Sequence, residues 1–176
     1  MTVFKNYFSI IIMVIATGCA GAKPLFYSKA TSNTDPVKFF IGGTHSTGVL
    51  ENAAGKPTAE VKTNTRGVAV RDSILIEQDL YQDGKKTHRS WKLNRLDEHH
   101  IDGTANNIEG VAHGLLNGNT FTWTFRFKLP ERKFIKHVRM TQYMYTMPGG
   151  QTMLIRSIIK KFGFKVAQIT EEFVRG

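Results

Sequence analysis

The sequence predicts an all-β domain, an antiparallel meander of eight to ten strands closed as a barrel, with a β-sandwich as the alternative. Three observations support this prediction. The stretch TFTWTFRFKL, residues 120–129, alternates apolar and polar side chains, which is the period of a strand with one buried face. Turn-forming residues separate the apolar segments, and no segment has a convincing amphipathic helical pattern.

The chain begins with the features of a secretory signal. A short start with one cation, Lys5, precedes the apolar residues 8–16, and this run is shorter than the about 20 residues that a membrane-spanning helix needs. The segment ATGC, residues 16–19, resembles the lipobox of bacterial lipoproteins. This resemblance implies that residues 1–18 are removed as a signal peptide and that Cys19 carries the acyl chains.

Acylation of Cys19 would attach the protein firmly to a membrane, because two or more acyl chains hold stably where one binds reversibly. Ala20 stands where an Asp commonly retains lipoproteins at the inner membrane, so we expect the outer membrane, facing the periplasm. Residues 19–36 are polar and end at a proline, which predicts a lipidated tether before a domain at 37–176. We expect this domain to be a monomer.

The expected strands follow one another through short turns. Asp83-Gly84 predicts a hairpin with a tight primed turn. A possible exception to the strand pattern is RSIIKKF, residues 156–162, whose apolar side chains would also suit one helical turn. The expected strands are residues 39–50, 59–70, 73–82, 85–96, 108–116, 120–129, 134–147, 151–159 and 165–174.

Four glycines favour a barrel over a sandwich. Gly103, Gly110, Gly114 and Gly118 recur through one region, and glycine within strands marks bulges and the tight bends of barrel corners. Closure also removes the open edges that invite aggregation. We therefore expect a barrel with a lipocalin-like interior.

Two aromatic residues on the expected strands, Trp91 and Trp123, and a third, Tyr143, are candidates for the wall of a ligand cavity. Phe121 and Phe125 belong to the same stripe. An aromatic stripe of this kind is also typical of a plain hydrophobic core, so both interpretations stand at this point.

The polar candidates are Glu77, Asp79 and Arg89, which the hairpin would bring near cross-strand partners. A Glu–Arg pair inside a barrel could bind a carboxylate or phosphate head group, because the guanidinium fork matches such oxyanions. On the outside, the same pair would be a surface salt bridge that stabilises little.

The positive charge is concentrated near the C-terminus. Residues 126–176 contain eleven Lys and Arg against three Asp and Glu, whereas residues 19–125 contain twelve against eleven. Such a region attracts nucleic acid, anionic lipid or acidic glycan alike. An envelope location excludes nucleic acid and leaves anionic lipid head groups, or a basic surface that only aids solubility.

No pattern of metal or nucleophile chemistry is present in the sequence. The histidines have no metal-ligand spacing, and no nucleophile elbow occurs. We expect no metal and no cofactor.

Four segments together carry a family resemblance: FFIGG at 39–43, LIEQDLYQDGKKTHRSWKL at 75–93, IDGTANNIEGVAHGLLNGNTFTW at 101–123, and KKFGFKVAQITEEF at 160–173. They resemble an uncharacterised family of proteobacterial lipoproteins with a lipocalin-like, calycin-type barrel. The resemblance implies this fold over about residues 39–175 and no particular activity. Barrels of the wider group hold fatty acids, lysophospholipids and other apolar molecules.

We therefore expect an outer-membrane-anchored periplasmic lipoprotein whose barrel binds or carries an apolar ligand derived from a fatty acid or phospholipid. One alternative is an enzyme that acts on a membrane lipid inside the barrel, with Glu77, Asp79 or His113 as acid or base. The other is a structural or assembly protein with a filled barrel.

Overall fold

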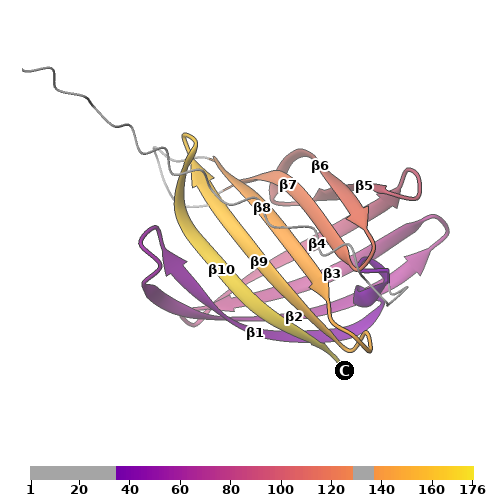
Figure 1. Cartoon of the computed structure of the whole chain (residues 1–176), viewed down its shortest axis with the longest axis horizontal. Coiled ribbons are helices and arrows are strands. Elements are labelled where there is room, and N and C mark those ends of the chain that lie inside the picture. Colours follow the sequence, from indigo (N-terminus) through magenta and orange to yellow (C-terminus); the bar gives the residue numbers. More distant parts are fainter. Residues whose placement is uncertain (1–34, 129–136) are drawn as a thin grey trace, which may run out of the picture.

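The computed structural model describes residues 35–128 and 137–176, which form one closed antiparallel barrel of ten strands (Figure 1). Each strand pairs with the next along the chain, and β1 pairs with β10 to close the barrel. The barrel prediction is confirmed, while the signal peptide, Cys19 and nearly all of the tether lie outside the described residues. The elements are η1 Lys38–Phe40, β1 Gly42–Asn52, β2 Pro57–Val70, β3 Ser73–Gln82, β4 Lys85–Arg95, β5 His100–Ala105, β6 Ile108–Asn117, β7 Thr120–Lys128, β8 His137–Thr146, β9 Thr152–Lys161 and β10 Phe164–Arg175.

Strand β7 has the two faces that its alternation predicts. Phe121, Trp123 and Phe125 are buried, while Thr124 and Arg126 are exposed. The turn between β3 and β4 is also confirmed as a primed turn, because both of its central residues have positive φ, 50° at Asp83 and 73° at Gly84.

Two local predictions are wrong. Residues 156–162 form no helical turn: β9 continues to Lys161, and its buried Met153, Ile155 and Ser157 follow the strand period. The first strand begins at Gly42 rather than at residue 39, because η1 precedes it. Asp35 starts that turn by accepting hydrogen bonds at Oδ1 from the backbone N–H of residue 37, at 2.9 Å, and of residue 38, at 3.4 Å.

Glycines shape the barrel in two different ways. Gly110 has φ 73° next to a register shift between β6 and β7, which is the bulge that the sequence suggests. Gly103 and Gly114 instead make room for aromatic rings. A Cβ at Gly114 would lie 2.3 Å from the Phe121 ring, and one at Gly103 would lie 2.8 Å from the Trp123 ring.

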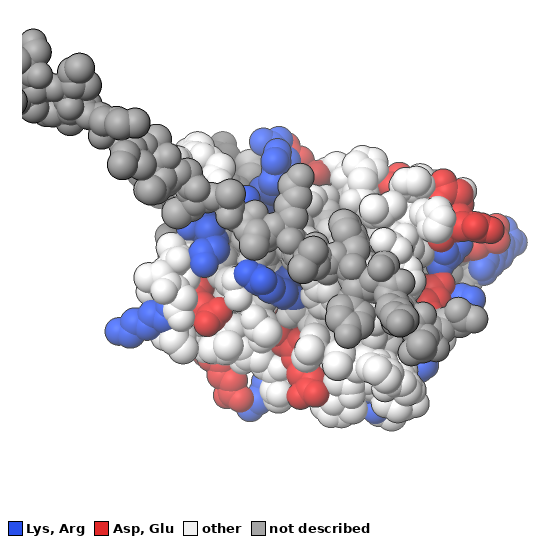
Figure 2. Space-filling model, in the orientation of Figure 1, with Lys and Arg blue, Asp and Glu red and all other residues white. Residues whose placement is uncertain are grey.

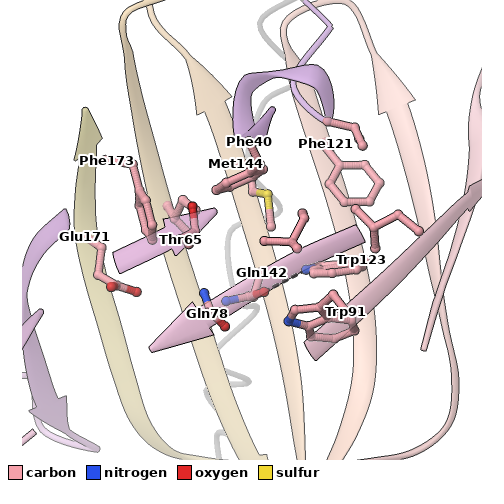
Figure 3. Close-up of a pocket in the computed structure, with 14 residues that line it drawn as sticks. Phe40, Thr65, Gln78, Trp91, Phe121, Trp123, Gln142, Met144, Glu171 and Phe173 are labelled. Carbon is pink, nitrogen blue, oxygen red and sulfur yellow. Dashed lines mark hydrogen bonds between the residues drawn. The ribbon is translucent and has the colours of Figure 1, made fainter. Parts of the chain in front are cut away.

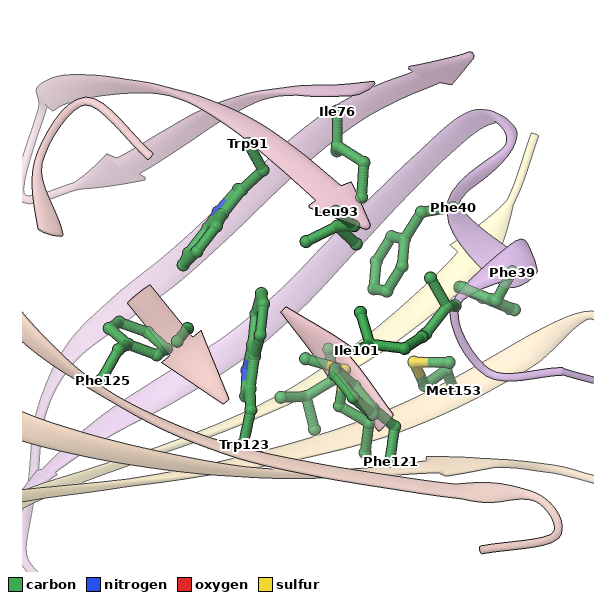
Figure 4. Packing of buried hydrophobic residues seen from close by; sticks show 14 of the residues in the cluster. Phe39, Phe40, Ile76, Trp91, Leu93, Ile101, Phe121, Trp123, Phe125 and Met153 are labelled. Carbon is green, nitrogen blue, oxygen red and sulfur yellow. The ribbon is translucent and has the colours of Figure 1, made fainter. Parts of the chain in front are cut away.

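The antiparallel order gives the barrel two distinct ends. The turns within the pairs β1–β2, β3–β4, β5–β6 and β9–β10 lie at one end, which we call the hairpin end. Helix η1 and the C-terminus lie at the other, the η1 end. Here Phe39 and Phe40 are buried (Figure 4). Phe40 packs edge to face on Phe173, with ring centroids 5.7 Å apart. Helix η1 therefore closes its end of the barrel.

Among the described residues the only helix is the single turn η1. This part of the chain therefore has no helix that is long and apolar enough to cross a bilayer.

Candidate functional site

A small cavity lies inside the barrel beside η1. It offers about 40 Å³ to the centres of water-sized molecules, which is room for a few waters. Most of its wall is apolar, and it includes Phe40 of η1 and Val37, the residue that precedes η1. The polar side chains in the wall are those of Thr65, Gln78, Gln142 and Glu171 (Figure 3).

Trp91 on β4 and Trp123 on β7 form the aromatic side of the cavity. Both are buried, and their ring centroids are 4.5 Å apart with an interplanar angle of 30°. Phe121 and Phe125 pack against Trp123 at 5.2 and 5.4 Å. The inward position predicted for both tryptophans is confirmed, and they serve as core and as cavity wall together.

Gln142 is fixed in place by two hydrogen bonds. Trp123 donates from Nε1 to Gln142 Oε1 at 2.7 Å, and Gln142 donates from Nε2 to Ser157 Oγ at 2.8 Å. Gln78, on the opposite wall, makes no side-chain hydrogen bond within the described part of the chain, and its amide points into the cavity (Figure 3). The cavity thus has one fixed amide and one that is available to a ligand.

Glu171 on β10 places a carboxyl group inside the barrel. Its Oε1 accepts hydrogen bonds from Ser46 Oγ at 2.9 Å and from Thr63 Oγ1 at 2.8 Å. Burial raises the pKa of Glu171, while the two hydroxyls and the positive charge of Arg89 act in the opposite direction. Gly48 makes this position possible, because a Cβ there would lie 2.6 Å from Glu171 Cγ.

Arg89 on β4 is a second buried charge, with only 8% of its surface exposed. Its Nε has no hydrogen-bond partner, and the guanidinium carbon lies 4.8 Å from the ring centroid of Phe127 and 5.5 Å from that of Trp91. Burial lowers the pKa of Arg89 to about 10, and the charge of Glu171 offsets this only in part. Within the described residues, Arg89 makes no ion pair with any carboxylate.

Arg89 pairs with Gln78 in the β3–β4 register. It lies two residues along β4 from Trp91, which lines the cavity, in the direction of the hairpin end. Because Gln78 lines the cavity, a ligand that reached past this amide would meet the guanidinium.

The prediction that Glu77 or Asp79 pairs with Arg89 inside the barrel is wrong. Glu77 lies opposite Ser90 and accepts its hydroxyl, and both side chains are on the outer face. Asp79 lies opposite His88 on the same outer face, at 2.7 Å from His88 Nδ1. The two-residue turn sets this register, and Glu77 and Asp79 have the parity opposite to that of Arg89.

These outer side chains form a charged ladder on β3 and β4. The hydrogen bond from His88, followed by that from Lys86 at 2.9 Å, lowers the pKa of Asp79. The same bond to Asp79 raises the pKa of His88, which also lies 2.9 Å from a carboxylate oxygen of Glu77. The shifts arise in exposed ion pairs, so they give no sign of an acid or base inside a cleft.

The inward position expected for Tyr143 is also wrong. Tyr143 lies between Thr122 and Arg156 on the outer face of the sheet. Its neighbours Gln142 and Met144 point inward instead. The buried methionines of β8 carry the inward parity, and Tyr143 does not share it.

His113 lies on the outside, 2.8 Å from Asp102. The interior acid or base role suggested for Glu77, Asp79 or His113 therefore has no support from their positions. Among residues 35–128 and 137–176, no group of three or more His, Cys, Asp or Glu side chains is placed to hold a metal ion.

Sequence reasoning missed three inward polar residues, Gln78, Gln142 and Glu171. The signal was strand parity: Glu171 shares a face with Ile169 and Phe173, both buried. A charged side chain between two apolar inward positions is the mark of a buried polar site.

The fold and the interior site define a closed antiparallel β-barrel with a polar group of side chains set in an aromatic wall. The chain belongs to the family described as "Protein of unknown function (DUF3833)", which matches residues 13–175. Among solved structures, the S-type phycobiliprotein lyase CPES from Guillardia theta is similar, with a TM-score of 0.58 and 15% identity over 79% of this chain and 89% of that one. At this identity the similarity concerns the fold alone. A comparison with curated proteins found no match.

Proposed function

We propose that this protein binds a small amphipathic molecule with an anionic head group, such as a fatty acid or a phospholipid-derived acid, inside its barrel. The observation that carries the proposal is Arg89, a guanidinium that is buried within the barrel and has no hydrogen-bond partner at Nε. A buried charge without a partner costs free energy, and a carboxylate matches the two-pronged geometry of a guanidinium.

The apolar part of the ligand would follow the tryptophans toward η1. The cavity, at about 40 Å³, is much smaller than the about 300–1,000 Å³ of a typical ligand pocket, so an acyl chain requires side chains to move. The side chains of Phe40 in η1 and of Val37 just before η1 are the candidates, because both line the cavity at the closed end of the barrel. An ion pair between Asp35 and Arg95 connects the residues that precede η1 to the end of β4.

The two tryptophans provide the test, since they are the only ones in the chain and both line the cavity. Dodecanoate and dodecanol would be titrated into residues 20–176, and the change in tryptophan emission gives the affinity. Hydrogen bonds to a charged group contribute about 1.5–3 kcal/mol, so Arg89→Gln should weaken dodecanoate about 10- to 150-fold and leave dodecanol nearly unchanged.

Arg66→Gln is the matched control, because Arg66 is an exposed arginine on the outer face of β2. An equal loss for acid and alcohol in the Arg89 variant would contradict the head-group role. No response to either compound, or to longer acids, would favour the structural barrel over the binding barrel.

We also propose that the protein is an outer-membrane lipoprotein anchored through Cys19, facing the periplasm. The support is the ATGC segment behind a short apolar run, with Ala20 after the cysteine. Cys19→Ala should prevent acylation and release the protein from the membrane fraction, measured by fractionation of cells and by mass spectrometry of the N-terminal peptide. Unchanged membrane partition of the variant would refute the anchor.

A further inference from the structure

The tip of the β9–β10 hairpin exposes two phenylalanines to solvent. Phe162 is 87% exposed and Phe164 is 78% exposed, and the next most exposed large apolar side chain among the described residues is Leu96, at 62%. The tip projects at the far end of these strands from the C-terminus (Figure 1). Single exposed apolar residues are ordinary on protein surfaces, whereas two aromatic rings at one protruding turn indicate a contact with something apolar.

The backbone conformation at the tip indicates that a phenylalanine at position 162 does not stabilise the fold. Phe162 and Gly163 form the two-residue turn, with φ of 48° and 86°. Such primed turns favour Asn, Asp or Gly at both positions, and a bulky residue in the left-handed region is strained. Phe162 thus occupies a strained position without being buried, which points to a role outside the folding of the domain.

The charged residues next to the tip in the sequence are all positive. Lys160, Lys161 and Lys165 flank the two phenylalanines, and residues 151–170 contain no Asp or Glu. The ammonium of Lys161 lies 4.8 Å from the ring centroid of Phe162. By contrast, basic and acidic side chains are interspersed on the face of the molecule seen in Figure 2.

Aromatic side chains beside lysines are the composition of segments that bind at the surface of an anionic bilayer. The rings enter the boundary of the acyl chains, while the flexible lysine stems leave the ammonium groups at the level of the phosphates. We propose that the β9–β10 tip is a membrane contact of this kind, in which Phe162 and Phe164 insert into an anionic lipid surface. This inference does not depend on ligand binding in the barrel, and it does not require acylation of Cys19.

The experiment places a tryptophan at the tip and asks whether lipid tails reach it. Phe162→Trp and Phe164→Trp are compared with Leu96→Trp, an exposed apolar position between β4 and β5. The full chain is added to vesicles of phosphatidylcholine alone, or with one quarter phosphatidylglycerol, whose acyl chains carry bromine as a short-range quencher. The native Trp91 and Trp123 are each only 5% exposed and supply a constant background.

We expect quenching at positions 162 and 164 on the anionic vesicles, several-fold less on phosphatidylcholine alone, and none at position 96. A single basic residue near an anionic surface changes membrane affinity about fivefold. Replacement of Lys160, Lys161 and Lys165 by Gln in the Phe162→Trp background should therefore remove most of the quenching, as should high salt.

Four outcomes would overturn the proposal. Absence of quenching at both tip positions would exclude insertion. Equal quenching at position 96 would show that the whole chain binds without a defined contact. Equal quenching on both lipid compositions, unaffected by the lysine replacements, would remove the anionic surface as the partner. A blue shift at position 162 that depends on protein concentration, without vesicles, would place a second copy of the chain at the tip instead and would also refute the membrane contact.

Discussion

Replacing Arg89 by methionine separates a binding role from a stabilising one. The pKa of Arg89 is about 10 against an ordinary 12.5, which at 1.36 kcal/mol per pKa unit corresponds to about 3 kcal/mol of unfavourable burial. Against this stand its contacts with the rings of Phe127 and Trp91, which contribute about 1–2 kcal/mol. Methionine fills a similar volume without a charge. We therefore expect Arg89→Met to raise the free energy of unfolding by about 1 kcal/mol.

Urea unfolding is the suitable assay, because the midpoint should rise while the slope stays constant. The sign of the pH dependence is fixed by the lowered pKa. The cost of the charge is fully present below pH 10 and is relieved only as the pH rises from about 10 toward 12.5. The gain from Arg89→Met should thus be constant between pH 5 and 9, while binding of dodecanoate is weakened.

A loss of more than about 1 kcal/mol in the Arg89→Met variant would refute this reasoning. It would mean that the guanidinium stabilises the barrel through its contacts with the two rings and its electrostatic interaction with Glu171. The burial of Arg89 would then be explained by stability and would not indicate a ligand. Arg66→Met, at an exposed position on β2, should change stability by no more than about 0.5 kcal/mol and controls for the general effect of removing an arginine.

Three further substitutions test the interior. Burial raises the pKa of Glu171, so the ionised carboxylate costs stability at neutral pH. Glu171→Gln should accordingly be more stable than the natural protein at pH 7. Urea midpoints measured between pH 8 and 4 should show this difference in stability shrink as the pH falls, and it should vanish near pH 4.5, the ordinary pKa of a glutamate. Trp123→Ala should lower the free energy of unfolding by about 3–5 kcal/mol, and a loss below about 1 would contradict its place in the core. Gly114→Ala would put a methyl group 2.3 Å from the Phe121 ring and should cost about 1–3 kcal/mol by the same assay, whereas Gly43→Ala, with open space around it, should be nearly neutral.

Strand parity and turn chemistry made much of the fold predictable. The alternation of residues 120–129 placed Trp123 and its phenylalanine neighbours on the buried face, and Asp83-Gly84 gave the hairpin turn. The start of the first strand was not predictable in this way. An apolar pair at residues 39–40 suits a strand and a buried helical turn equally, and only its packing on β10 and the hydrogen bonds to Asp35 decide for η1.

The site was less predictable because closure of the barrel assembles it. Ser46 and Thr63 reach Glu171 across 125 and 108 residues of sequence, and no local pattern reports such a meeting. Arg89 was identified, yet it was given the wrong partner. A two-residue turn at 83–84 places Gln78, not Glu77, opposite Arg89, so careful counting of the register would have moved both acids of β3 to the outer face.

The polar interior bears on the choice between a filled barrel and a binding barrel. For stability alone, well-packed apolar side chains at the positions of Arg89 and Glu171 would serve as well or better. Arg89 and Glu171 interact electrostatically, yet no ion pair forms between them within the described structure, although a direct pair would satisfy both charges most simply. Their separation leaves the guanidinium available to a carboxylate from outside the protein. The same arrangement that costs the empty fold stability therefore favours an anionic head group at Arg89, with its apolar tail along Trp91 and Trp123 toward η1.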